Sequence, residues 1–93
     1  MARKTVKLNE KGVAKLPNDK PVVYKIQTES GNTNYVGIAK RGRVQERIQE
    51  HMDADKIPGV KVQIEQMPSI EVAQKKEQNI ISRTRPKYNE QGE

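Results

Sequence analysis

The strongest local signal in this chain is a predicted β-hairpin. Residues 22–26 are mostly β-branched and alternate in polarity, and residues 33–38 form a second short run that favours a strand. The polar segment 29–32 between them, Glu-Ser-Gly-Asn, is typical of a turn. Each run contains one tyrosine, so we expect Tyr24 and Tyr35 to lie near each other on paired strands. From the hairpin alone, both are interpreted as core aromatics whose hydroxyls reach water.

A chain of 93 residues has room for one small domain. We expect this domain to cover residues 21–93, preceded by a basic N-terminal extension at residues 1–20. The absence of cysteine excludes disulfides, thiolate zinc sites and a thiol nucleophile. No apolar run approaches the length of a membrane span, and the polar start of the chain does not resemble a signal peptide. We therefore expect a cytoplasmic protein with no membrane partner, and the oligomeric state is left open.

The charge of the chain favours a polyanionic partner. Eighteen Lys and Arg residues against twelve Asp and Glu give a net charge of +6, which favours nucleic acid over a small acidic ligand. The chain has no Phe or Trp and only three Tyr, so it has few surfaces on which unpaired bases could stack. Contact with phosphates is the more plausible mode of binding, and the basic loop at residues 40–43 offers one place for it.

The N-terminal extension is predicted to form a small amphipathic hairpin, with residues 5–8 and 13–16 on either side of a turn at 9–12. Two interpretations are open. The segment is either a solvated cover for the small domain or a basic arm that contacts a phosphate backbone.

A helix is predicted from Val44 to Met52, because these two residues and Ile48 recur at four-residue intervals. At about 100° per residue, His51 falls about 20° and Arg47 about 60° from Val44, on one side of the buried stripe. An exposed pair of cations at this spacing would be unfavourable, because like charges repel. A bound phosphate between the two side chains would remove that repulsion.

Residues 60–67 alternate strictly between apolar and polar side chains, which predicts a strand with one covered face. Val60, Val62 and Ile64 are expected to face the core. The strand is expected to stop at Pro68, and Ser69 is expected to be the N-cap of the next helix.

This last helix carries a glutamate within its apolar face. At about 100° per residue, Ile70 and Ile81 lie at about 0° and 20°, and Glu77 lies at about 340°. An unpaired buried charge costs several kcal/mol. Glu77 is therefore expected to be protonated, paired with a cation such as Arg47, bound to a metal ion, or placed at the end of a cleft open to water.

Taken in order, these residues resemble the GIY-YIG nuclease domain family over about residues 21–92. The segments Val22-Val23-Tyr24 and Tyr35-Val36-Gly37 stand where the family has its two tripeptides, with ten residues between the tyrosines. Arg47 followed by His51 resembles the arginine of the family's helix and the His or Tyr that often follows it.

The end of the chain continues the resemblance, since Glu77, Pro86 and Asn89 match the family's closing pattern of Glu followed by Pro-x-x-Asn. The sequence departs from the family at Val22, where the family has glycine, and in a longer segment before Arg47. This longer segment leaves Arg41 and Arg43 as competing candidates for the arginine that contacts the scissile phosphate.

The resemblance implies a small α/β fold with a three-stranded, mostly antiparallel sheet flanked by helices, in the order β-β-α-α-β-α. It also implies a metal-dependent DNA endonuclease of undetermined DNA specificity. In that function Glu77 would bind Mg2+ or Mn2+, and Arg47 would clamp the scissile phosphate. Tyr24 would act as the base or orient the attacking water. Tyr35 and His51 would position groups or relay protons, and Asn89 would brace the site. One alternative is a non-catalytic nucleic-acid-binding module of the same fold. Another is a basic module for a protein partner, which would need an exposed apolar patch.

Overall fold

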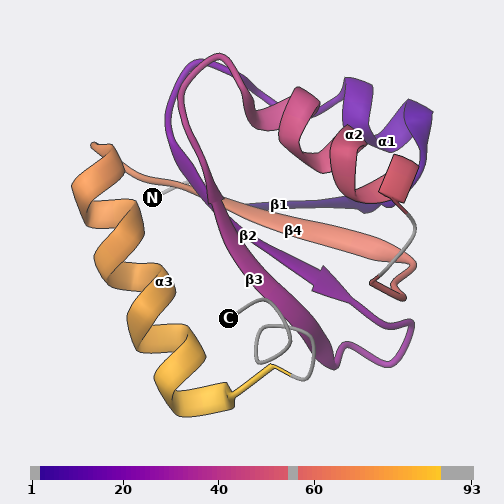
Figure 1. Cartoon of the computed structure of the whole chain (residues 1–93). Helices are drawn as coiled ribbons and strands as arrows, with labels where there is room; N and C mark the ends of the chain where they lie inside the picture. The colour runs from indigo at the N-terminus through magenta and orange to yellow at the C-terminus, as the bar shows by residue number, and fades with distance from the viewer. Residues whose placement is uncertain (1–2, 55–56, 87–93) are drawn as a thin grey trace.

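The computed structural model describes residues 3–54 and 57–86. Within these ranges the chain forms four strands and three helices (Figure 1). Their order is β1 (Arg3–Lys7), α1 (Glu10–Ala14), β2 (Val22–Gln27), β3 (Thr33–Ala39), α2 (Val44–Ala54), β4 (Lys61–Gln66) and α3 (Ile70–Thr84).

The four strands form one sheet in the order β1-β4-β2-β3, and every neighbouring pair is antiparallel. The predicted α/β class is confirmed, but the expected number of three strands is wrong. The extra strand is β1, which pairs with β4 and places Val6 opposite Val62. The predicted helix order is also wrong, because α2 is the one helix between β3 and β4 in the described part of the chain.

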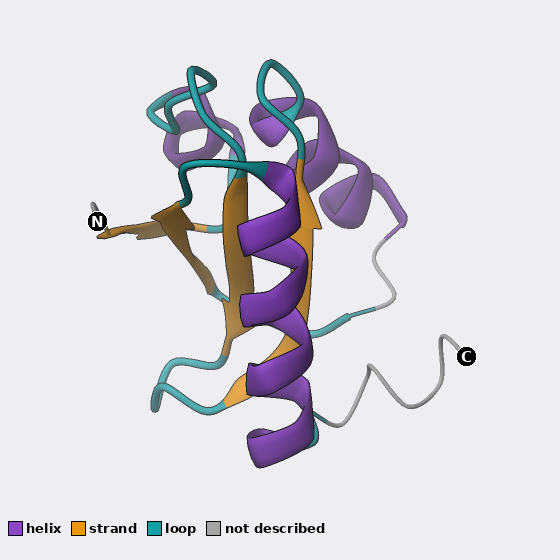
Figure 2. Cartoon of the chain, turned by 90° about the vertical axis from the view of Figure 1, so that its left-hand side faces the viewer, coloured by secondary structure: helices purple, strands orange, loops and turns teal. Residues whose placement is uncertain are grey.

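The helices cover the two faces of the sheet, with α1 and α2 on one face and α3 on the other (Figures 1 and 2). Because side chains alternate along β2, Tyr24 packs on the α1 and α2 side, whereas Val23 packs on the α3 side. The first core cluster contains Val13, Leu16, Val22, Tyr24, Ile26, Ala39, Val44, Ile48, Val62 and Ile64. The second contains Val23, Val36, Met67, Ala73 and Ile80.

The predicted N-terminal hairpin is wrong, because a short helix takes the place of its second strand. The side chain of Asn9 caps α1 by accepting a hydrogen bond of 2.7 Å from the Gly12 backbone N–H. Gly12 lies so close to the end of β1 that a Cβ there would overlap the carbonyl of Lys7. Val13 and Leu16 are buried in the first core cluster. The division into an extension at residues 1–20 and a domain at residues 21–93 stays a prediction.

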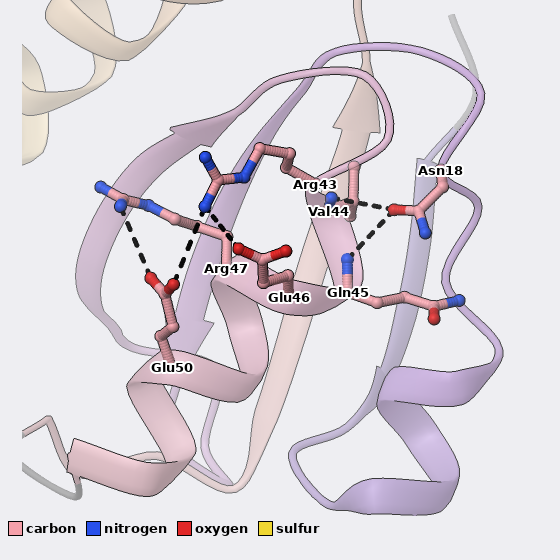
Figure 3. Close-up of polar contacts among 7 residues, drawn as sticks. All are labelled: Asn18, Arg43, Val44, Gln45, Glu46, Arg47 and Glu50. Carbon is pink, nitrogen blue, oxygen red and sulfur yellow. Dashed lines mark hydrogen bonds and ion pairs between the residues drawn. The ribbon is translucent and has the colours of Figure 1, made fainter.

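The N-terminal segment also holds the start of α2 (Figure 3). Oδ1 of Asn18 accepts hydrogen bonds from the backbone N–H groups of Val44 at 2.8 Å and Gln45 at 3.1 Å. The Asn18 carbonyl accepts a third, of 2.7 Å, from Gly42. In return, the side-chain amide of Gln45 donates to the Leu16 carbonyl at 2.7 Å. These contacts fix the loop between β3 and α2 against residues that come before β2.

The central hairpin is confirmed, and its turn is closed by hydrogen bonds between Thr28 and Asn32 and between Gly31 and Thr28. The N-cap predicted at Ser69 is confirmed, since its side chain accepts from the Val72 N–H. The expectation for Val60 is wrong. Because β4 begins one residue later, Val60 lies outside the alternating pattern and is 52% exposed.

Candidate functional site

Tyr24 lies in the middle of β2, and its side chain is fully buried. It pairs with Gly37 on β3, and the phenol ring crosses directly over that residue. A Cβ at position 37 would lie 2.5 Å from both Cζ and the hydroxyl oxygen of Tyr24. The glycine therefore leaves the space that lets the Tyr24 ring lie across the neighbouring strand.

Three rings meet at this position. The ring centroids of Tyr24 and Tyr35 are 6.1 Å apart, and that of His51 lies 5.4 Å from the first and 5.0 Å from the second. The Tyr24 hydroxyl forms a 2.6 Å hydrogen bond with Nε2 of His51. The cluster thus joins β2, β3 and the last turns of α2, and the expected proximity of the two tyrosines is confirmed.

The environment keeps His51 neutral. Burial is the main reason that the pKa of His51 lies below its ordinary value of 6.5, and the positive charge of Arg47 lowers this pKa further, while Glu50 opposes the shift. At pH 7 the ring is therefore uncharged. In the tautomer protonated at Nδ1, Nε2 is an acceptor for the Tyr24 hydroxyl.

The environment also keeps Tyr24 protonated. Burial raises the pKa of Tyr24 well above 10, and the negative charges of Tyr35 and Glu77, when ionised, act in the same direction. Arg47 opposes this rise through its charge and its hydrogen bond to the phenol. The opposing effect is the smaller one, so Tyr24 is a neutral phenol at physiological pH and not a phenolate.

Glu77 lies on α3 and is partly buried. Burial raises the pKa of its carboxyl, and Arg47 opposes this effect. No residue in the described ranges forms an ion pair with Glu77. The expected alternative of a pair with a cation such as Arg47 is therefore not seen among the described residues, and the other three alternatives stay predictions.

Glu77 is also the residue that the sequence proposes as a metal ligand. Among residues 3–54 and 57–86, no group of three or more His, Cys, Asp and Glu side chains is arranged to hold a metal ion. A divalent ion at Glu77 would need water or substrate oxygens for its remaining ligands.

Arg47 belongs to a charged network at the start of α2 (Figure 3). Its Nη1 lies 3.7 Å from Oε1 of Glu50, whose Oε2 lies 4.0 Å from Nη2 of Arg43. Arg43 also forms a hydrogen-bonded ion pair with Glu46. From the sequence, Arg43 is a candidate only in competition with Arg47. Neither Glu46 nor Glu50 is a candidate. Their spacing of three and four residues from one another is the signal that could have identified the network.

A pocket of about 320 Å³ lies beside this network. It lies at β3, one of the two edge strands of the sheet, and bridges the two faces because α2 and α3 both contribute to its wall. Its cationic side is formed by Lys40, Arg43 and Arg47, and the rest of its lining by Ile38, Ala39, Ile70 and Gln74. Arg41 is exposed and does not line this pocket.

The structure brings together most of the residues that the sequence singled out. Tyr24, Tyr35 and His51 are in mutual contact, and the charges of Arg47 and Glu77 act on the Tyr24 hydroxyl. Asn89 lies outside the described residues, so its predicted place beside the site stays a prediction.

None of the helices that the structure describes is long and apolar enough to cross a membrane. Comparisons of the chain with protein-family models, with curated proteins and with solved structures find no match.

Proposed function

We propose that this protein is a divalent-metal-dependent DNA endonuclease that hydrolyses phosphodiester bonds with a site of the GIY-YIG type. The observation that carries the proposal is the set of groups around one hydroxyl. The Tyr24 hydroxyl is hydrogen-bonded to His51 at 2.6 Å and lies within the electrostatic reach of Arg47 and Glu77. An acceptor for a proton, a cation for a phosphate and a carboxylate for a metal ion are the groups that phosphodiester hydrolysis needs.

The hydrogen bond between Tyr24 and His51 supports a specific proton path. Because the pKa of Tyr24 is raised, a phenolate is not available as a free base. The Tyr24 side chain is buried in this structure, so the attacking water must first gain access to its hydroxyl. The phenol can then take a proton from that water if its own proton passes to Nε2 of the neutral His51 in the same step. One proton leaves water, one moves from tyrosine to histidine, and the imidazole becomes imidazolium. Tyr24 is then the relay and His51 the final acceptor.

Arg47 is the candidate for the phosphate contact, because its half-exposed guanidinium lines the cationic pocket and its charge acts on the Tyr24 phenol. Glu77 suits a hard divalent ion such as Mg2+ or Mn2+, since its carboxylate is partly exposed and has no ion pair with a described residue. When bound, such an ion would neutralise charge on the phosphoryl oxygens and stabilise the leaving oxygen. Asn89 is proposed to brace the site, as the resemblance implies.

The second candidate is a non-catalytic nucleic-acid-binding module of the same fold. It is favoured by one observation: in the described ranges, no group of three or more His, Cys, Asp and Glu side chains is arranged to hold a metal ion. The two candidates share the cationic pocket and differ only in the chemistry at Tyr24 and Glu77.

A cleavage assay separates them. The protein is incubated with duplex, branched and single-stranded DNA in the presence of Mg2+, Mn2+ or EDTA, and binding is measured on the same substrates. The Tyr24→Phe variant, purified in the same way, is the control for contaminating nuclease. Cutting that needs the metal and the Tyr24 hydroxyl supports the endonuclease, binding without cutting supports the module, and the absence of binding contradicts both.

A further inference from the structure

The two arginines at the start of α2 converge on a single carboxylate. Glu50 lies between them, with Oε1 at 3.7 Å from Nη1 of Arg47 and Oε2 at 4.0 Å from Nη2 of Arg43 (Figure 3). Each oxygen of one carboxylate thus faces a different guanidinium. Both distances exceed those of a good hydrogen bond, and all three side chains are about half exposed. Ion pairs of this kind contribute little and are readily displaced.

A backbone phosphate has the same features that Glu50 presents to the arginines. It carries one negative charge, and it has two non-bridging oxygens that two guanidinium groups can approach separately. Guanidinium is planar and offers several N–H donors, so it binds phosphate at least as well as it binds carboxylate. The position of Glu50 therefore marks a place where the geometry of Arg43 and Arg47 already fits an anion.

The pocket beside the arginines gives such a phosphate room to enter. Arg43 and Arg47 line it together with Lys40, and its lining contains no acidic residue. Its apolar side, which includes Ile38 and Ile70, suits the sugar that a backbone phosphate carries. On the pocket side, the three cations thus face a volume of about 320 Å³ that can hold a phosphate and part of its nucleotide.

We propose that Arg43 and Arg47 bind one backbone phosphate of a nucleic acid between them, and that Glu50 is an internal competitor for this phosphate. The inference rests on the proposed function, because it takes nucleic acid as the partner. It extends that function by adding Arg43 to the binding site and by giving Glu50 an opposing role. When the phosphate binds, the exposed Glu50 side chain turns to solvent.

The ion pairs distinguish Glu50 from its neighbour Glu46. Arg43 keeps its hydrogen-bonded pair with Glu46 whether or not Glu50 is present. For Arg47, Glu50 is the one carboxylate in the described ranges that lies within ion-pair distance. Neutralising Glu50 therefore removes the one ion pair of Arg47 in the described ranges, leaves its hydrogen bond to the Tyr24 phenol, and releases Arg43 in part, so affinity for a phosphate backbone should rise.

The test is the binding of a fluorescent 20-base-pair DNA duplex, followed by anisotropy in EDTA so that no cutting occurs. The variants are Glu50→Gln and a matched control, Glu29→Gln, which removes the same charge from an exposed position in the β2–β3 turn. We expect Glu50→Gln to tighten binding about 3- to 10-fold, the effect of releasing two exposed ion pairs and one repulsive charge. Glu29→Gln should tighten it by less than about 2-fold, because its charge acts only over a distance.

A second comparison tests whether the gain depends on the arginines. In a chain that already carries Arg43→Gln and Arg47→Gln, the further change Glu50→Gln should raise affinity no more than Glu29→Gln does. Thermal unfolding of each variant shows that the fold is retained. Equal gains from Glu50→Gln and Glu29→Gln in the otherwise unchanged chain would overturn the clamp while leaving nucleic-acid binding intact. Failure of the unchanged chain to bind the duplex at low salt would overturn the proposed function itself.

Discussion

The hydroxyl of Tyr24 lies 2.6 Å from Nε2 of His51, although the two residues are 27 positions apart in the chain. The strand β2 fixes the tyrosine, and the packing of α2 against the sheet through Val44 and Ile48 fixes the histidine. Because a packed core sets this distance, the two side chains need to move little during a proton transfer. The hydrogen bond that the proposed relay would use is thus preorganised, a property that is useful in catalysis.

Replacing Tyr24 by phenylalanine removes one oxygen and keeps the ring in the core. We expect the rate of DNA cutting to fall about 10²- to 10⁴-fold, the range typical of general acid–base catalysis, with little change in affinity. Thermal unfolding should change only slightly, because the partly exposed His51 can bind water in place of the phenol. Single-turnover cleavage and a melting curve on the same preparation check both statements. Unchanged cutting would leave Tyr24 with a purely structural role.

Acidification should destabilise the protein through His51. Because burial and Arg47 lower its pKa, the folded state binds the proton less readily than the unfolded chain. The stability that His51 contributes is therefore present above its unfolded pKa of about 6.5 and is lost as the pH falls through the folded pKa. Denaturant unfolding between pH 7.5 and 5 should show a smaller loss for His51→Gln than for the unchanged chain.

Glu77 changes the pH dependence of stability in the opposite direction, but it is present in both the unchanged chain and His51→Gln. The difference between their two stability curves therefore reports on His51. Parallel stability curves would mean that His51 is no harder to protonate in the folded state. The relay also requires neutral His51, and the cutting rate should fall over the same acidic range.

Glu77→Gln should abolish cutting in Mg2+ and in Mn2+ while binding in EDTA is retained. The raised pKa of Glu77 means that its stabilising contribution is complete below its unfolded pKa and is lost as the pH rises through its folded pKa. At pH 8 the glutamine variant should therefore melt at the same temperature or higher. A loss on the order of 3 to 5 kcal/mol would instead indicate that the glutamate is one half of a buried ion pair.

Arg47→Ala should weaken DNA binding and abolish cutting. If Arg47 contacts a phosphate, the slope of log affinity against log salt should decrease by about 0.9. Arg41→Ala is the matched control, since it removes the same charge from an exposed residue that does not line the pocket. A wild-type affinity that stays constant across a fourfold rise in salt would contradict nucleic-acid binding altogether.

Gly37→Ala tests the close approach between β2 and β3. The new methyl group would lie 2.5 Å from the Tyr24 hydroxyl oxygen and Cζ, so the ring must move. We expect a loss of about 1 to 3 kcal/mol in unfolding free energy, as is usual for an overpacked core. The loss should be smaller in a chain that carries Tyr24→Phe, because one of the overlapping atoms is gone. Additive effects would indicate that the ring does not lie over position 37.

Local patterns in the sequence predicted the elements that lie near the site. The hairpin, α2 and α3 all have periodic apolar residues and clear turns or caps, and the shared side of Arg47 and His51 follows from helical spacing alone. The pairing of Tyr24 with Gly37 also follows once the hairpin register is known. These features depend on contacts that are close in the sequence.

The errors arose where distant segments decide the structure. The sequence pattern predicts a strand at residues 13–16, but the cap at Asn9 and the burial of Val13 and Leu16 against α2 favour a helix. The fourth strand exists because β1 pairs with β4, almost sixty residues away, which no local pattern reports. The local spacing of these charges indicates that they can pair, but it does not show that Arg43 and Arg47 converge on Glu50, because side-chain direction at this loop–helix junction depends on how Asn18 holds it.

The three hydrogen bonds of Asn18 make the start of α2 and the N-terminal segment a single cooperative unit. The amide hydrogens of Gly42, Val44 and Gln45 are all donated to this one residue. Opening of the segment before β2 would expose all three amides together and release the first turn of α2, so they should exchange with solvent at a common rate. The arginines that this turn carries would then lose their fixed spacing. Residues 3–20 thus set the geometry of the cationic pocket, although none of their side chains lines it.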